Sequence, residues 1–193
     1  RRQAPARLIH VASLNRVKDQ TTLLHALAAV AETGMDFRMD VVGVDTLDGE
    51  VQRLAQSLGL EQQVCFHGFK TQSDLRPMME AADLLVMSSR HEAGPLVVLE
   101  AAVAGVPTVG TAVGHIAEWS PSAALAVPLA NPARLAHAIC LLLANEDCRL
   151  YLARAAQGRA LLEDADFTAR AFESLHLQLV RARNESTAAT LVH

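Results

Sequence analysis

Several features that would point to common functions are scarce in this chain of 193 residues. Aromatic residues make up only 4% of it, too few for the stacking platforms that bind single-stranded nucleic acid. The net charge is −4, so nothing in the composition favours nucleic acid or anionic lipid. The longest apolar stretch towards the end, 135–144, includes His137 and is too short to cross a bilayer. We therefore expect neither a nucleic-acid partner nor a membrane span.

The cysteines are also few. Cys65, Cys140 and Cys148 show no C-x-x-C spacing and cannot build a disulfide framework. We expect reduced thiols, which predicts a cytoplasmic location. No group of His, Cys and acidic residues has the spacing of a metal site along the sequence, so no metal is predicted. The chain begins with Arg1 rather than Met, and we expect it to be part of a longer protein.

Well-known catalytic and phosphate-binding motifs are missing as well. There is no G-x-G-x-x-G after the first predicted strand and no G-x-x-x-x-G-K-[ST], which excludes the common dinucleotide fingerprint and the P-loop. There is no G-x-S-x-G nucleophile elbow. His91-Glu92 lacks the second His of a zinc protease helix.

What the chain does contain is an alternation of apolar strands and amphipathic helices. Hydrophobic residues make up 51% of it and charged residues 20%, which predicts a globular core. The strands are predicted at 8–12, 37–43, 64–66, 84–87, 106–109 and 124–127. The helices are predicted at 23–31 after an N-cap at Asp19, and at 48–58, 74–82, 96–104, 131–144, 146–162 and 167–183, with a frayed tail at 184–193.

The strands are apolar throughout rather than at every second residue. That pattern is typical of a parallel sheet covered on both faces. We therefore predict an α/β fold, with a Rossmann-like parallel sheet of six strands and helices on both faces, in one domain at 1–183. Ligands of such folds bind at the carboxyl ends of the strands, so the loops at 12–19, 43–48, 67–70, 88–95 and 110–118 are the candidate site.

Two acidic residues in the segment 88–102 are the strongest candidates. Glu92 lies between a strand and a helix, and Glu100 is the only ionisable residue between Leu96 and Gly110. A carboxylate in an apolar helix needs hydrogen-bond donors or water. Glu100 therefore faces either solvent or the hydroxyls of a ligand, such as a ribose diol, and the sequence leaves both open.

The start of the same helix predicts an anion site. The backbone N–H groups of Gly94, Leu96 and Val97 lie near its positive end, where phosphate binds well. In the loop after the first strand, Arg16 and Lys18 could neutralise a diphosphate from the other side. The alternative is that both are ordinary solvated charges.

Three other residues are expected to be structural. His10 lies in a strand and is predicted to be packed or hydrogen-bonded. Trp119 is predicted to pack a loop rather than bind a base. Cys140 is predicted to lie in a helix core.

Five segments in order resemble one family. Glu92 and Glu100 match an E-x7-E motif, the segment from Gly105 resembles G-x-P-x-V, and 111–118 resembles T-x-x-G-G-x-x-E. Residues 64–69 resemble V-x-F-x-G-[FY], and the first loop resembles G-R-x4-K-G with Lys18 on its Lys. The chain thus resembles, over roughly 7–180, the C-terminal donor-binding half of a retaining glycosyltransferase of the GT-B fold, family four (group 1).

This resemblance implies roles for individual residues. Lys18 would bind the diphosphate of a nucleotide-sugar donor, Glu100 the ribose hydroxyls, and Glu92 would lie beside the transferred sugar. The backbone at 94–97 would hold the distal phosphate, and Phe69 and Lys70 would flank the base. The family needs no metal, because cations and a helix end stabilise the leaving diphosphate.

Three departures from the family pattern are visible. Ser13 stands where the family has Arg, and our hypothesis is that Arg16 takes over its charge. Ala93-Gly94-Pro95 replaces the usual G-F-G. His115 replaces the second Gly of the G-G pair, and it either reaches a phosphate or sugar or is a loop histidine without a ligand.

The expected activity is transfer of a sugar from a nucleoside diphosphate to an acceptor hydroxyl, with retention at the anomeric carbon. The acceptor, a glycan, lipid or small molecule, would bind an N-terminal domain absent from this chain, so the chain alone would not turn over. The full-length protein is expected in the cytoplasm and at the inner membrane face as a peripheral protein. The alternatives are an inactive nucleotide-sugar-binding module and a sugar-nucleotide 2-epimerase of the same fold.

Overall fold

The computed structural model describes residues 5–162. The predicted helix at 167–183 and the predicted tail at 184–193 lie outside these residues, so the domain boundary at 183 stays a prediction. The chain divides into a unit that ends at Gln157 and a second that begins at Gly158. The sheet and the candidate site belong to the first unit.

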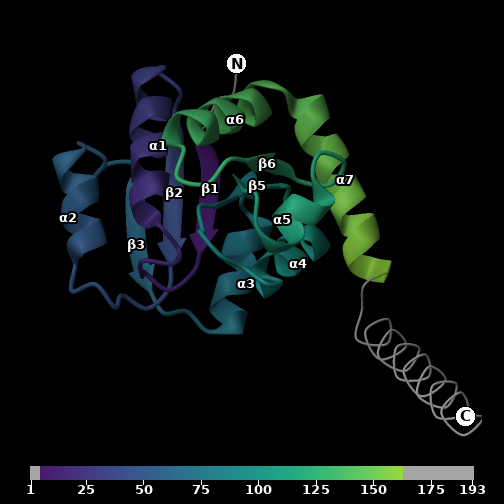
Figure 1. The fold of residues 1–193 in the computed structure, drawn as a ribbon, viewed down its shortest axis with the longest axis horizontal. Helices are drawn as coiled ribbons and strands as arrows, with labels where there is room; N and C mark the ends of the chain where they lie inside the picture. The colour runs from purple at the N-terminus through teal and green to yellow at the C-terminus, as the bar shows by residue number, and fades with distance from the viewer. Residues whose placement is uncertain (1–4, 163–193) are drawn as a thin grey trace, which may run out of the picture. The chain divides into compact units, whose positions relative to one another are not determined.

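Strands and helices alternate along the described residues up to the last two helices, which follow one another directly (Figure 1). The strands are β1 (Ala6–Val11), β2 (Phe37–Val42), β3 (Val64–Gly68), β4 (Leu84–Met87), β5 (Thr108–Thr111) and β6 (Leu125–Val127). The helices are α1 (Gln20–Glu32), α2 (Glu50–Ser57), α3 (Gln72–Glu80), α4 (Leu96–Val103), α5 (Gly114–Trp119), α6 (Pro132–Ala144) and α7 (Glu146–Leu162). None of the helices in residues 5–162 is both long and apolar enough to span a membrane.

All strand pairs are parallel, in the order β3-β2-β1-β4-β5-β6. The prediction of a six-stranded parallel α/β sheet is confirmed. Side chains of alternate strand residues such as Leu8, Met39 and Val109 form one core with α1, α2 and α6. Helix α5 covers the other face, because a Cβ on Gly110 would lie 2.9 Å from Cδ1 of Ile116. The sheet therefore has helices on both faces, as expected.

Two predictions of secondary structure were wrong in detail. Residues 114–119, predicted to lie in a loop, form α5, whose N-cap Val113 has no capping side chain. A helix of six residues that begins with Gly114 carries too little periodicity to be found. Strand β5 begins at Thr108 rather than Val106, because the N–H of Val106 bonds to the carbonyl of Ala101 and Pro107 has no N–H to donate.

The loop after β1 is held by local hydrogen bonds. Asp19 is the N-cap of α1, as predicted, and its carboxylate accepts from the N–H and the hydroxyl of Thr22. Gly43, at the end of β2, comes close to this loop. A Cβ at Gly43 would lie 2.0 Å from the carbonyl oxygen of Ala12, so only glycine fits there.

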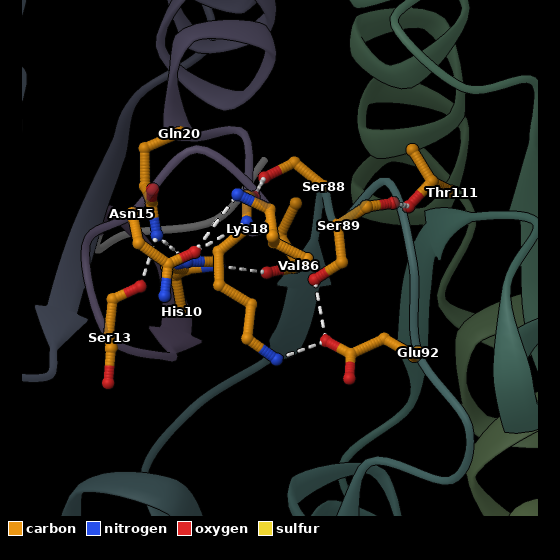
Figure 2. Close-up of polar contacts among 11 residues, drawn as sticks. His10, Ser13, Asn15, Lys18, Gln20, Val86, Ser88, Ser89, Glu92 and Thr111 are labelled. Carbon is orange, nitrogen blue, oxygen red and sulfur yellow. Dashed lines mark hydrogen bonds and ion pairs between the residues drawn. The ribbon is translucent and has the colours of Figure 1, made fainter.

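His10 is fully buried in β1 and hydrogen-bonded at both ring nitrogens, which confirms its structural role. Nδ1 lies 2.8 Å from the carbonyl oxygen of Val86, so it carries the proton. Nε2 lies 3.2 Å from the side-chain nitrogen of Gln20, which donates to it (Figure 2). The imidazole is therefore neutral. A second proton, at Nε2, would point at the side-chain N–H of Gln20, which is itself a donor. The pKa of His10 is lowered from 6.5 to about 4, mainly by burial and also by the charge of Lys18, while the Val86 bond and Glu92 act in the opposite direction.

This pKa predicts an acid-sensitive fold. The unfolded chain protonates His10 below pH 6.5, whereas the folded chain does so only near pH 4. The stabilisation is therefore complete above pH 6.5 and is lost as the pH falls towards 4, by roughly 3 kcal/mol in total. Urea unfolding of the wild type and of His10→Gln between pH 7.5 and 4 measures this. The variant should lose less stability over that range, and equal losses in the two proteins would contradict the assignment.

Candidate functional site

The candidate site lies where the strand order reverses. β1 and β4 are neighbours in the sheet, but β1 is followed by α1 on one face while the helices after β4 and β5 cover the other. Loops that leave two such strands diverge and open a crevice at their carboxyl ends, where parallel α/β sheets bind ligands. The loops at 12–19 and 88–95 form this crevice.

An ion pair connects the two loops. The ammonium of Lys18 contacts Oε1 of Glu92, and the hydroxyl of Ser89 donates to the same oxygen at 2.7 Å (Figure 2). The side chains of Lys18 and Glu92 are only 24% and 10% exposed. Both are thus largely withdrawn from water, so neither is an ordinary solvated charge. Ser89 was missed by the sequence analysis, although its place directly after an apolar strand was a signal.

Hydrogen bonds to the backbone hold the two loops around this ion pair. Ser88 donates from its hydroxyl to the carbonyl of Lys18 at 2.8 Å, and Thr111 donates to the carbonyl of Ser89 at 2.5 Å (Figure 2). Asn15 accepts from the N–H of Lys18 at 3.0 Å. Because these contacts join the ends of β1, β4 and β5, the ion pair has a preorganised position.

A second set of contacts joins the same loops at their solvent side. The N–H of Arg90 donates to the carbonyl of Val17, and its Nε lies 2.9 Å from Oδ2 of Asp19. Asp19 therefore caps α1 and also holds the loop after β4. Arg90 was not among the predicted site residues.

Helix α4 begins beside Glu92, as predicted. Its N-cap, Pro95, has no side chain that could bond to the first N–H groups. The predicted anion-binding residues Gly94, Leu96 and Val97 lie at this end, with Gly94 and Leu96 exposed and Val97 buried. The helix start therefore presents backbone donors and the positive end of the helix dipole.

Helix α5 begins against the same loop. A Cβ on Gly114 would lie 3.0 Å from Pro95 and 3.2 Å from Glu92, so the two helix starts are close together. His115 lies over Gly94, because a Cβ there would be 3.2 Å from His115 Nε2. Its ring stacks on Trp119, with 5.4 Å between the ring centroids. Trp119 is buried, which confirms its packing role, whereas His115 is brought to the predicted anion site.

Glu100 lies further along α4, in the groove between α3 and α4. Its Oε1 accepts from the side-chain amide of Gln72 at 3.0 Å. Gln72 follows directly on the loop of Phe69 and Lys70, so Glu100 is adjacent to the loop predicted to flank a base. Phe69 is 71% exposed. Glu100 is half-buried and paired with Gln72, and its role towards a ligand stays a prediction.

Lys18 and Glu100 do not contact each other. Lys18 contacts Glu92, which lies just before α4. Glu100 lies within α4 and contacts Gln72 at the start of α3. Glu100 is four positions after Leu96, so it lies about 6 Å along the axis from the helix start. A diphosphate at the helix start and a ribose beside Glu100 would be adjacent.

The two remaining candidates in the first loop point elsewhere or carry no charge. Arg16 forms a bidentate ion pair with Glu50 of α2, both N–O distances being 2.7 Å, and its side chain is 70% exposed. Ser13 is exposed, and its carbonyl accepts from Gln20. The structure thus gives Arg16 a partner away from Glu92, and the hypothesis that it replaces an arginine at Ser13 gains no support from its position.

Comparison with known proteins shows the family of the chain. Residues 1–159 match the family described as glycosyl transferases group 1. The D-inositol 3-phosphate glycosyltransferase of Corynebacterium urealyticum is 29% identical over 187 residues, which cover 92% of this chain and 44% of that protein.

Two solved structures are similar as well. HepE of Anabaena in complex with UDP-glucose is 25% identical, with a TM-score of 0.77 over 89% of this chain and 49% of that one. Sucrose-phosphate synthase of Thermosynechococcus elongatus is 26% identical, with a TM-score of 0.78 over 92% of this chain and 46% of that one. The chain spans less than half the length of each relative. Since the family match covers most of its residues, this chain belongs to the group 1 glycosyltransferases.

Proposed function

We propose that this chain is the donor-binding part of a retaining glycosyltransferase, which transfers a sugar from a nucleoside diphosphate to an acceptor hydroxyl. The observation that carries the proposal is the Lys18–Glu92 ion pair at the start of α4, in the crevice where the strand order reverses. Family membership and the similarity to a UDP-glucose complex support the donor class.

In this proposal the leaving diphosphate lies between the start of α4 and Lys18. An ammonium has three donors, so Lys18 can keep its contact with Glu92 while it binds a phosphate oxygen. The N–H groups of Gly94, Leu96 and Val97 bind the distal phosphate, as helix starts do. Charge developing on the diphosphate is then stabilised by groups already in place, without a metal ion.

Glu92 acts at the sugar. Its carboxylate lies at the rim of the phosphate site and is aimed by Ser89 and Lys18. It binds sugar hydroxyls and stabilises the positive charge that develops at the anomeric carbon as the bond to the diphosphate breaks. Its role is electrostatic and orienting, so no covalent intermediate on Glu92 is required.

The nucleoside lies along α4. Glu100 accepts hydrogen bonds from the ribose diol, and the loop of Phe69 and Lys70 flanks the base. The Gln72–Glu100 bond supports this placement, because it joins the base loop to the ribose carboxylate. The second wall of the cleft and the acceptor site belong to an N-terminal domain, so the chain alone binds the donor but does not transfer it.

Two variants separate the phosphate contact from the ribose contact. Lys18→Met should weaken UDP binding about tenfold and leave uridine binding unchanged, because loss of a charge-assisted hydrogen bond costs roughly 1.5 kcal/mol. Glu100→Gln should weaken both ligands by a similar factor. Calorimetric titration of the chain with UDP and uridine, with GDP and ADP for comparison, measures these effects.

Matched controls are available on the surface of the described residues. Arg154→Ala on α7 and Glu32→Gln on α1 remove exposed charges of the same signs away from the crevice and should leave binding unchanged. If UDP binds the Lys18→Met and Glu100→Gln variants as tightly as the wild type, the proposed donor site is wrong.

Sugar transfer itself tests Glu92. In the full-length protein, Glu92→Gln should lower kcat on the order of 100-fold while UDP affinity stays nearly constant, because its contact acts on the reacting sugar. A radiolabelled nucleotide-sugar assay with single-turnover analysis measures this. Wild-type protein that binds the donor but transfers nothing would point instead to an inactive binding module.

A further inference from the structure

We propose that Asp40, Cys65 and His67 form a zinc site on the exposed edge of the sheet. Asp40 lies on β2 directly opposite Cys65 on β3, and Cys65 and His67 are two residues apart on one strand. Side chains two apart share a face of a strand, so all three point the same way. Their ligand atoms lie within 4.8 Å of one another.

The three side chains project from the face of the sheet that lies opposite the main core. The residues that alternate with them, Met39, Val64 and Phe66, pack in or against that core. β3 is one of the two edge strands of the sheet (Figure 1). Cys65 is exposed, and the side chains of His67 and Asp40 are 25% and 24% exposed. A metal ion can therefore reach the cluster from solvent.

The donor set suits zinc better than the hard cations. One thiol, one imidazole and one carboxylate supply sulfur, nitrogen and oxygen, whereas calcium and magnesium select oxygen ligands. The carboxylate and a deprotonated thiol together balance the charge of Zn²⁺. Three protein ligands leave a fourth tetrahedral position, which the exposed edge leaves open to water.

The distances fit after small side-chain movements. Nε2 of His67 lies 2.7 Å from Oδ1 of Asp40, which is a direct hydrogen bond. Bond lengths of about 2.0 to 2.3 Å in a tetrahedron place ligand atoms roughly 3.3 to 3.7 Å apart. Zinc would therefore replace this hydrogen bond by opening it roughly half an ångström or more, with Sγ already within 4.8 Å of both atoms. This change is a side-chain rotation on a fixed strand register.

Sequence spacing could not reveal this site, because Asp40 and Cys65 are 25 positions apart and meet only through the β2–β3 register. The inference rests on that register and not on the proposed function. Zinc would link the edge strand to β2, so its binding should raise the thermal stability of the fold.

The test is metal binding by the purified chain after chelator treatment. The wild type should bind one equivalent of Zn²⁺ in calorimetry, with an increase in Tm. Titration with Co²⁺ should produce a thiolate-to-metal charge-transfer absorption. Cys65→Ser should abolish that absorption, and Cys65→Ser and His67→Asn should each weaken Zn²⁺ binding more than about tenfold, since even outer-shell changes cost that much.

Controls use the same residue types elsewhere in the described residues. Cys148→Ser in α7 and His25→Asn on the exposed side of α1 should keep both the absorption and the affinity. Because Cys65 and His67 are partly solvent-exposed, we expect both variants to have the Tm of the metal-free wild type. An unchanged Tm would show that the variants fold. The proposal would be overturned if the wild type did not bind one equivalent of Zn²⁺. It would also be overturned if Cys65→Ser and His67→Asn bound Zn²⁺ as tightly as the wild type.

Discussion

The contact between Lys18 and Glu92 is the interaction on which the arrangement of the crevice depends. β1 and β4 lie side by side, yet their loops leave towards opposite faces of the sheet. Glu92 is largely withdrawn from water, and a carboxylate in that position needs a cation and hydrogen-bond donors. Lys18 and Ser89 provide both. The ion pair therefore ties together the two loops that bound the crevice.

The residues beneath this pair keep its charge well defined. His10 is buried below the loop and neutral, held by Val86 and Gln20. A protonated His10 would repel Lys18, and this repulsion is one cause of its lowered pKa. The neutral imidazole thus leaves Lys18 as the cation that faces Glu92. Stability of the fold and electrostatics of the crevice depend on the same buried group.

Periodicity was enough to predict the sheet, because strands buried on both faces and helices with one apolar stripe leave clear patterns. It also placed Glu92 and Glu100 near the carboxyl edge. Contacts between side chains distant in sequence were out of reach. Gln72 meets Glu100, and Asp40 meets His67, only once helix packing and strand register are known. α5 was missed because six residues give no usable period.

The first loop shows how far charge alone can explain a diphosphate site. Arg16 is held by Glu50, and Ser13 has no charge, so Lys18 is the cation of this loop that faces the crevice. One ammonium cannot balance a diphosphate, so the donor site that we propose would also need oriented N–H groups. α4 and α5 both begin there, with His115 beside Gly94. In the proposed donor site, backbone dipoles would therefore take over part of what a second cation would supply.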